Sequence, residues 1–465
     1  MNATTSPARG PVRPDERALA PDLARGFMLL MIALANTPWY LWGSPQSSMG
    51  AHPTDGSALD RAVQFVMITA VDGRIYPMFA CLFGYGMMRL YDRQREAGAS
   101  ERSAAGVLRR RHLWLLVFGF LHTLLLFMGD ILATYGLAGL ILGWLLLRRS
   151  ERAIRIAAGV LLGVVLLLYG LTLLGAVAAA SAPPSAADAE STAGIPDILH
   201  ASFGEPDILA AAVDRVIVWP LMLLVQVFGL TVPAMMALGM VLAKRRVLER
   251  PQDHLRLLTW TAVIGIGVAW VSGLPHAMAH VGLFDSSELL NTSLGGVQQL
   301  SGVFGGTGYV ALFGLIGYAM TRRSRRGVVT TAVAAVGKRS LSCYLAQSVI
   351  CAPLLTAWGV GLGGVFGSAQ MAAFAVGVWL VTLVGAYAME RADVRSPAEV
   401  LLRRLSYRGR SRPGNDPAAT AGAPAAAPAA PSGTDAFPAS PTAPPAPPTP
   451  GPQPPADGPT APPGR

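Results

Sequence analysis

Apolar runs of about 20 residues follow one another along most of this chain, and each can cross the hydrocarbon core of a bilayer as a helix. The composition agrees, because 52% of the residues are hydrophobic, only 14% are charged, and the mean hydropathy is +0.44. A soluble globular domain carries about a quarter charged residues. The runs therefore predict an all-α integral membrane protein, a polytopic bundle embedded in the lipid bilayer.

Clusters of basic residues separate the runs and predict how the chain crosses the membrane. When every cluster is placed in the cytoplasm, ten crossings with both termini inside satisfy the positive-inside rule without an exception. Because this topology accounts for the net charge of +10, we expect no nucleic-acid partner. We predict a multi-pass protein of the cytoplasmic membrane, with a polar N-terminus over 1–20 and a membrane domain over 21–411. Its predicted spans are 24–43, 75–91, 112–128, 131–147, 156–178, 214–243, 255–275, 299–320, 340–358 and 369–389.

The apolar stretch 62–91 is too long for one straight crossing. It is interrupted at Asp72-Gly73-Arg74 and again at Pro77. We interpret 60–72 as an amphipathic segment on or dipping into the membrane, followed by the second span. The alternative is one long tilted helix, which would place Asp72 and Arg74 deep in the bilayer.

Prolines mark two further segments. Pro220 and Pro233 lie within the sixth span and predict a kinked helix. The C-terminal segment 412–465 holds 18 of the 36 prolines, together with Ala, Gly, Ser and Thr. Because this composition cannot form an apolar face, it predicts a disordered cytoplasmic tail with polyproline II-like stretches.

Two ionisable residues lie in the apolar hairpin formed by 112–128 and 131–147. His122 is near the outer end of its first arm, and Asp130 follows that end. Ionisable groups within membrane segments are functional candidates. If the turn folds back, Asp130 can orient His122 as a general base. The alternative is a histidine satisfied by a neighbouring helix, with Asp130 capping the next one.

Other polar residues are candidates for binding. Asp22 and Arg25 lie three apart at the start of the first span, where the pair can anchor the helix or meet a phosphate. The neighbouring Asp72 and Arg74 have the same two interpretations. His52, in the first outer loop, is a further possible base, with a solvated loop histidine as the alternative interpretation.

Tyr344 and Gln347 lie three apart in the ninth span, as interhelical hydrogen-bonding residues or as part of a pocket. No zinc-ligand spacing, Gly-rich phosphate loop or Ser-His-Asp order is evident. His276 and His280 are at helical spacing, but no third ligand is near, so we expect no metal site.

Motifs along 22–407 resemble the YeiB-like family of bacterial membrane proteins, a domain-of-unknown-function family numbered 418. No single motif is specific, but five occur in the expected order. They are Asp22-Leu-Ala-Arg25-Gly26 running to Asn36; Arg74-Ile-Tyr-Pro-Met-Phe79 with Leu82-Phe83-Gly84-Tyr-Gly86; His122 with Gly129-Asp130-Ile-Leu132 and Tyr135; Val336-Gly337-Lys-Arg339-Ser-Leu341-Ser342-Cys343-Tyr344-Leu345 to Gln347-Ser348; and Ser396-Pro397-Ala-Glu399 with Arg403 and Tyr407. The chain departs from the family pattern at Cys343, more often Asn, and at Ser396, more often Gly.

More distantly, the opening motif and the layout of about ten spans resemble the transmembrane acyltransferases, including the heparan-glucosaminide acetyltransferase type. This resemblance implies transfer of an acyl group from cytoplasmic acyl-CoA to an extracytoplasmic glycan or a lipid-linked acceptor. Many such enzymes carry a histidine where this chain has Asn36, so the base must come from elsewhere.

Together with these residues, the resemblance implies an acyltransferase-like enzyme with His122 as base, Asp130 as its orienting residue, and Arg25 and Arg74 facing anionic groups. Asp22, Asn36, Asp72, Tyr135, Tyr344 and Gln347 complete the candidate site. A transporter or export component, with the same charges along a substrate or proton path, is one alternative. A non-catalytic scaffold that recruits partners through its tail is the other.

Overall fold

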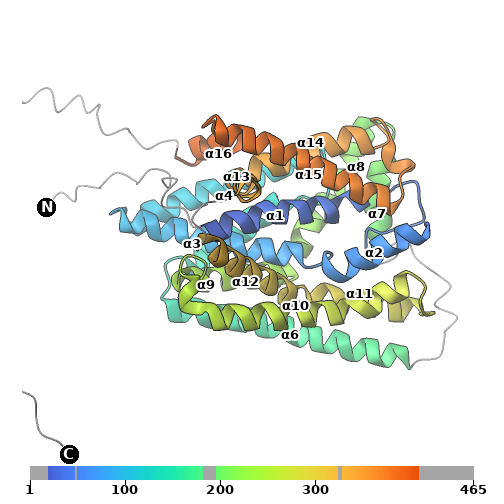
Figure 1. Cartoon of the computed structure of the whole chain (residues 1–465), viewed down its shortest axis with the longest axis horizontal. Helices are drawn as coiled ribbons and strands as arrows, with labels where there is room; N and C mark the ends of the chain where they lie inside the picture. Colours follow the sequence, from blue (N-terminus) through green and yellow to red (C-terminus); the bar gives the residue numbers. More distant parts are fainter. Residues whose placement is uncertain (1–18, 48–49, 182–194, 323–326, 408–465) are drawn as a thin grey trace, which may run out of the picture. The chain divides into compact units, whose positions relative to one another are not determined.

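The computed structural model describes residues 19–47, 50–181, 195–322 and 327–407, and these ranges are almost entirely helical (Figure 1). Within them, β pairing is limited to an isolated bridge between Gln46 and Pro53. Seven helical stretches there are long and apolar enough to cross a membrane. The predicted all-α membrane class is confirmed. Most of the N-terminus, the arginines at 323–326 and the Pro-rich tail lie outside the described residues.

Sixteen α-helices and three short 3-10 helices make up this part of the chain. In chain order they are α1 (Leu19–Asn36), η2 (Thr37–Tyr40), α2 (Ala58–Ala70), α3 (Ile75–Glu96), α4 (Glu101–Leu125), α5 (Leu132–Leu146), α6 (Glu151–Ala180), α7 (Ile195–Gly204), α8 (Ile208–Phe228), α9 (Thr231–Lys244), η4 (Pro251–His254), α10 (Leu255–His280), α11 (Glu288–Leu300), α12 (Gly302–Thr321), α13 (Val328–Lys338), α14 (Ser340–Leu355), η5 (Leu362–Gly364), α15 (Ser368–Arg391) and α16 (Pro397–Tyr407).

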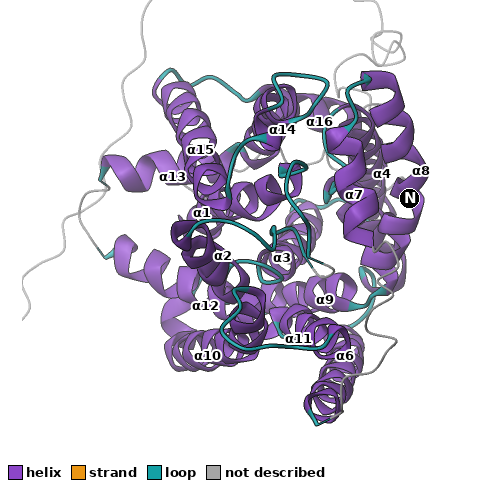
Figure 2. Cartoon of the chain, turned by 90° about the vertical axis from the view of Figure 1, so that its right-hand side faces the viewer, coloured by secondary structure: helices purple, strands orange, loops and turns teal. Residues whose placement is uncertain are grey.

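The helices form one bundle, with α1 and α3 inside it and α6 and α8 at its edge (Figure 2). Met28 of α1 and Met88 of α3 are completely buried. In contrast, Leu174 of α6 is 66% exposed and Leu209 of α8 is 73% exposed. Helices that bury one apolar face and expose another are expected where lipid covers the outside.

The basic clusters gather at one end of the bundle. Lys244 at the end of α9 pairs with Asp92 near the end of α3 at 2.6 Å, and Arg245 lies 3.7 Å from Glu151 at the start of α6. Helix α16 lies at the same end, because Tyr407 accepts a hydrogen bond from the Gln94 side chain of α3. Basic helix ends on one side are what the predicted positive-inside topology requires. The number of crossings and their direction remain predictions.

The charged interruption of the second apolar stretch lies inside the bundle. Helices α2 and α3 follow one another end to end (Figure 1), separated by a turn in which Gly73 has φ +75°. Gln64 of α2 is buried and donates to the carbonyl of Pro53 and to the hydroxyl of Ser368. Because Arg74 is also fully buried, this packing does not fit a segment on the membrane surface, and the break at Gly73 does not fit one continuous tilted helix.

The predicted kinked sixth span, 214–243, is in fact two helices, α8 and α9. The chain breaks at Gly229 and Leu230, where Leu230 adopts a left-handed φ of 66°. Pro233 lies in the first turn of α9, where a backbone N–H has no intrahelical partner to lose. This proline therefore starts a helix and does not bend one.

Three helices were not predicted from the sequence. Helix α7 lies between the fifth and sixth predicted spans, α11 lies mostly between the seventh and eighth, and α13 lies between the eighth and ninth. The start of α11 carries a cap, because the Ser287 hydroxyl accepts from the N–H of Leu290 at 3.2 Å. Its polar sequence was interpreted as a loop, but the side chain of Gln298 is buried.

Candidate functional site

His122 and Asp130 form a buried pair, as the hairpin predicted. Helix α4 ends at Leu125, which puts His122 in its last turn, and Asp130 lies in the turn before α5. The Nδ1 atom of His122 is 2.9 Å from Asp130 Oδ1, and both side chains are fully buried. The turn therefore folds back, and the carboxylate orients the imidazole.

The second oxygen of Asp130 caps α5. Asp130 Oδ2 accepts a hydrogen bond from the backbone N–H of Ala133 at 2.7 Å. Gly119 of α4 makes this approach possible, since a Cβ there would be 2.3 Å from both Ala133 N and Asp130 Oδ2. Both interpretations of Asp130, as a helix cap and as the partner of His122, hold at once.

A serine that the sequence analysis did not select completes this arrangement. Ser348 of α14 lies with its Oγ 2.8 Å from His122 Nε2. Because Asp130 accepts at Nδ1, the imidazole proton is assigned to Nδ1, and Nε2 is left to accept from the Ser348 hydroxyl. The ring of Tyr344, one helical turn before Ser348, lies 5.0 Å from the His122 ring.

The absence of a recognisable Ser-His-Asp order in the sequence was therefore misleading. Ser348 is 226 residues from His122, and helix packing alone brings them together. The signal available was the position of Ser348 beside Gln347 in a motif that resembles the YeiB-like family.

A buried arginine from α8 stabilises the end of α4, the turn that carries His122. Arg215 donates from Nε to the carbonyl of Thr123 and from NH2 to the carbonyl of Leu124, both at 3.1 Å. These carbonyls belong to the last turn of α4, where cationic donors stabilise a helix end. Arg215 thus fixes the turn that carries His122, and sequence analysis missed it.

A cavity of about 20 Å³ lies beside Ser348, with room for about one water molecule. Asn36, Gln347 and Tyr344 are in its wall. The hydroxyls of Thr37 and Tyr40 in the same wall are buried and have no hydrogen-bond partner in the described part of the chain. The cavity that Ser348 lines is therefore also lined by hydroxyl groups that can still donate.

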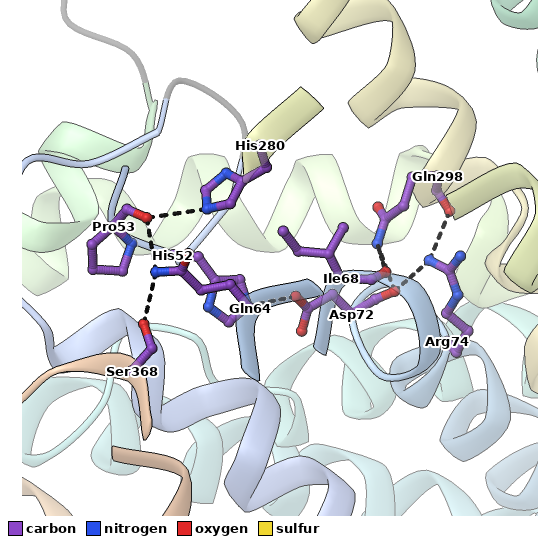
Figure 3. A network of polar contacts seen from close by, with 9 residues as sticks. All are labelled: His52, Pro53, Gln64, Ile68, Asp72, Arg74, His280, Gln298 and Ser368. Atoms are coloured by element: carbon purple, nitrogen blue, oxygen red, sulfur yellow. Dashed lines mark hydrogen bonds and ion pairs between the residues drawn. The ribbon is translucent and has the colours of Figure 1, made fainter. Parts of the chain in front are cut away.

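A second histidine–carboxylate pair lies in the segments that flank α2 (Figure 3). His52 Nε2 is 2.7 Å from Asp72 Oδ2, and the histidine is only 3% exposed. His52 comes from the loop before α2, and Asp72 comes from the turn after it. The loop histidine that could have been solvated is instead buried against a carboxylate.

Arg74 braces the turn that carries Asp72. It donates to the backbone carbonyls of Asp72 and Gln298 at 2.5 and 3.2 Å (Figure 3). It also donates to the backbone carbonyl of Ala269 at 2.6 Å. The Gln298 side chain returns to the same turn, donating to the carbonyl of Asp72 at 2.8 Å. Arg74 therefore contacts the backbone of Asp72, whereas the Asp72 carboxylate is hydrogen-bonded to His52. It is not among the residues that line either cavity.

A larger cavity, of about 220 Å³, lies beside Asp72. Asn36 lines this cavity as well as the small one at Ser348. Asn36 therefore lies between the cavity lined by Ser348 and the cavity lined by Asp72. The remaining lining residues include Trp39, Tyr76, Phe79, His276, Gln298 and Gln299.

The other predicted residues divide into two groups. Tyr135 donates through its hydroxyl to the carbonyl of Tyr76 at 2.8 Å, and Gln347 donates to the carbonyl of Leu29 at 3.2 Å, so both brace the walls. Asp22 and Arg25 are a pair at 3.6 Å near the opposite end of α1. Eleven residues of helix, about 16 Å, separate Arg25 from Asn36.

Among the described residues, no cluster of three or more His, Cys, Asp or Glu side chains is placed to hold a metal ion.

Comparisons with known proteins agree with the predicted family. Residues 242–409 match a family described as "Protein of unknown function (DUF418)". "Uncharacterized protein YeiB" of Escherichia coli is 28% identical over 84% of this chain and 97% of its own length. "Uncharacterized protein YxaH" of Bacillus subtilis is 24% identical over 85% of this chain and 96% of its own. No solved structure matches the chain significantly.

Proposed function

We propose that this chain, a YeiB-like protein of the DUF418 family, is a membrane-embedded enzyme that transfers an acyl group from acyl-CoA to an acceptor. The observation that carries the proposal is the hydrogen-bonded chain Ser348–His122–Asp130. A nucleophile, a base within hydrogen-bond reach of it, and a third group that orients the base are the parts of covalent acyl transfer.

In the first step, Ser348 Oγ attacks the thioester carbonyl carbon, and its proton passes to His122 Nε2. The carbon–sulfur bond breaks, the sulfur of CoA takes that proton, and the acyl group remains as an ester on Ser348. Asp130 holds the Nδ1 proton and stabilises the imidazolium between these two transfers. In the deprotonated form, Asp130 accepts also from Ala133, which keeps it in place throughout.

In the second step, an acceptor hydroxyl or amine gives its proton to His122 Nε2 as it attacks the ester carbon. The bond from that carbon to Ser348 Oγ breaks, and the oxygen recovers the proton from Nε2. Both steps pass through an oxyanion. The unpaired hydroxyls of Thr37 and Tyr40, in the wall of the cavity at Ser348, are the donors placed to stabilise it.

The anionic part of the donor would bind at the basic end of the bundle. Arg25 lies there, beside Gly86 of α3, and its guanidinium can form charge-assisted hydrogen bonds with a phosphate. In this proposal the basic end faces the cytoplasm of a bacterial cell, where acyl-CoA is found. The cavities by Asn36, toward the other end of α1, then lie in the extracytoplasmic half.

The test uses protein purified in lipid nanodiscs. Acetyl-CoA and longer acyl-CoAs are titrated by thermal shift, and release of free CoA is followed for wild type, His122→Ala and Arg25→Ala. We expect a saturable rise in Tm that Arg25→Ala weakens, and thioester cleavage that His122→Ala abolishes. His254→Ala, which removes a histidine from η4, is the matched control and should behave as wild type.

If no acyl-CoA raises the Tm and no CoA is released, acyl transfer is contradicted. The export or transport alternative then becomes the function to assay, with the same buried histidines as candidate proton carriers.

A further inference from the structure

The cavity of about 220 Å³ is an order of magnitude larger than the one at Ser348 and has a different wall. His276 of α10 lines it and is only 4% exposed. Neither ring nitrogen of His276 has a hydrogen-bond partner in the described part of the chain. A buried polar group without a partner costs about 1–3 kcal/mol, so two such nitrogens at a cavity indicate a ligand that satisfies them.

Apart from Asp72, the other polar side chains of this wall are neutral. The carboxamides of Asn36 and Gln299 make no hydrogen bond within the described residues, and Gln298 has its Oε1 atom to spare. A carboxamide both donates and accepts, as hydroxyl groups do. Together with an imidazole, these side chains match a ligand that presents several hydroxyls.

The charged side chain in this wall already has a hydrogen-bond partner. Asp72 is the charged residue among the described lining residues, and its carboxylate is engaged by His52. Arg74 is turned away, toward backbone carbonyls (Figure 3). An anionic ligand would find no Lys or Arg among the described lining residues, and a cationic ligand would compete with His52 for the Asp72 carboxylate.

Aromatic side chains supply the apolar part of the wall. Trp39, Tyr76 and Phe79 all line the cavity. Rings pack well against the C–H faces of a compact ligand whose edges carry polar groups. Neutral amides, an unpaired imidazole and aromatic faces in one cavity are complementary to a polyhydroxylated molecule.

We infer that this cavity binds a neutral, hydroxyl-rich ligand, with the imidazole of His276 and the carboxamides of Asn36 and Gln299 contacting its hydroxyls. Under the proposed function, on which this last step rests, the ligand is the acyl acceptor. Asn36 lines both cavities, so a hydroxyl bound beside it lies next to the cavity that holds Ser348. Asp72, whose carboxylate is hydrogen-bonded to His52, forms part of the wall of this cavity.

The experiment measures binding alone, without any acyl donor, so that its result does not depend on acyl transfer. The probe is methyl β-D-glucopyranoside, followed by saturation-transfer NMR with the protein in lipid nanodiscs, because sugar-headed detergents would compete. Glucuronate and glucosamine are the matched anionic and cationic probes. We expect the neutral probe to bind at least about tenfold more tightly than either charged one, a difference of about 1.4 kcal/mol.

Variants of the lining residue His276 form the second part of the experiment. His276→Phe keeps a ring of similar size but removes both nitrogens, and it should weaken binding of the neutral probe about tenfold or more. His254→Phe, the same change on η4, should leave binding unchanged. Thermal unfolding confirms that both variants are folded, and His276→Gln, which restores a polar side chain, should recover part of the affinity.

Absence of binding by the neutral probe, equal binding of a charged probe, or unchanged affinity in His276→Phe would each overturn the inference. None of these results bears on thioester cleavage by Ser348 and His122. Conversely, a protein that binds the glucoside but never releases CoA would contradict the proposed function and leave the binding site in place.

Discussion

The molecule contains two buried histidine–carboxylate pairs, and they differ in what completes them. His122 has Asp130 on one nitrogen and Ser348 on the other, at 2.9 and 2.8 Å. His52 has Asp72 on Nε2 at 2.7 Å, but its Nδ1 is buried without a partner in the described part of the chain. Ser348, which completes the first pair, lines a cavity of about 20 Å³, and Asp72 of the second pair lines one of about 220 Å³.

The groups around each histidine indicate different roles for the two histidine–carboxylate pairs. A histidine that contacts both a carboxylate and a hydroxyl is arranged to move a proton between reacting atoms. A histidine whose carboxylate lies in the wall of a roomy cavity is arranged to position a bound molecule. We therefore assign chemistry to the pair on the α4–α5 hairpin and acceptor binding to the pair around α2.

Substitutions in the two histidine–carboxylate pairs should differ most in their effects on the kinetics. His122→Ala or Asp130→Asn should lower the rate of thioester cleavage about 10³-fold, because general-base catalysis is lost or the imidazole tautomer is wrong. His52→Ala or Asp72→Asn should raise the acceptor KM about tenfold and leave donor-side cleavage without acceptor nearly unchanged. Steady-state kinetics with and without acceptor distinguish the two sets. Equal losses of donor-side cleavage in both would contradict the division of roles.

The glycines beside the two pairs should differ in their effect on stability. Gly119→Ala would place a Cβ 2.3 Å from a backbone nitrogen, which cannot move easily, so we expect a loss of about 2–3 kcal/mol. Gly73→Ala meets the far end of the Gln299 side chain, which can move, but it strains a φ of +75°, for a loss of about 1–2 kcal/mol. Denaturant or thermal unfolding measures both. Gly163→Ala on α6, with open space around it, is the control.

Substitutions of Arg25 test whether the binding site for the acyl-CoA phosphates is separate from the reacting residues. Arg25→Gln should raise the KM for acyl-CoA about tenfold with little change in kcat, since the residue is about 16 Å of helix from Asn36. Arg25→Lys should have an intermediate effect, because an ammonium keeps the charge without the planar pair of donors. A drop in kcat with unchanged KM would place Arg25 in the reaction itself.

Removing the Pro-rich tail should have the smallest effect. Neither pair lies in it, so truncation after residue 412 should leave acyl-CoA binding and CoA release within about twofold of the full chain. The same assays on the truncated protein measure this. Loss of function on truncation, with the membrane domain still folded, would favour the scaffold alternative.

Local patterns predicted some of these features and missed others. The apolar runs predicted the fold class, and the eight-residue separation across a tight turn allowed His122 and Asp130 to be paired. His52 and Asp72 were each selected, but Asp72 was paired with its neighbour Arg74, because contacts across 20 residues of loop and helix leave no periodic signal.

Long-range packing was out of reach for the same reason. Ser348 meets His122 across 226 residues, and Arg215 reaches α4 from 91 to 92 residues away. His276 was considered only as a metal ligand, because a missing hydrogen-bond partner can be recognised only in three dimensions. The polar helix α11 was interpreted as a loop, since its buried Gln298 looks like any exposed glutamine in the sequence.

The most direct test of the central claim is to look for the acyl group on Ser348. The protein in nanodiscs is mixed with acetyl-CoA in the absence of acceptor, quenched in acid within seconds, digested and analysed by mass spectrometry. Our account predicts an acetyl ester on the peptide containing Ser348, absent in Ser348→Ala and His122→Ala and present in Ser368→Ala, which alters a serine on α15. Continued CoA release by Ser348→Ala, with no adduct in the wild type, would contradict it.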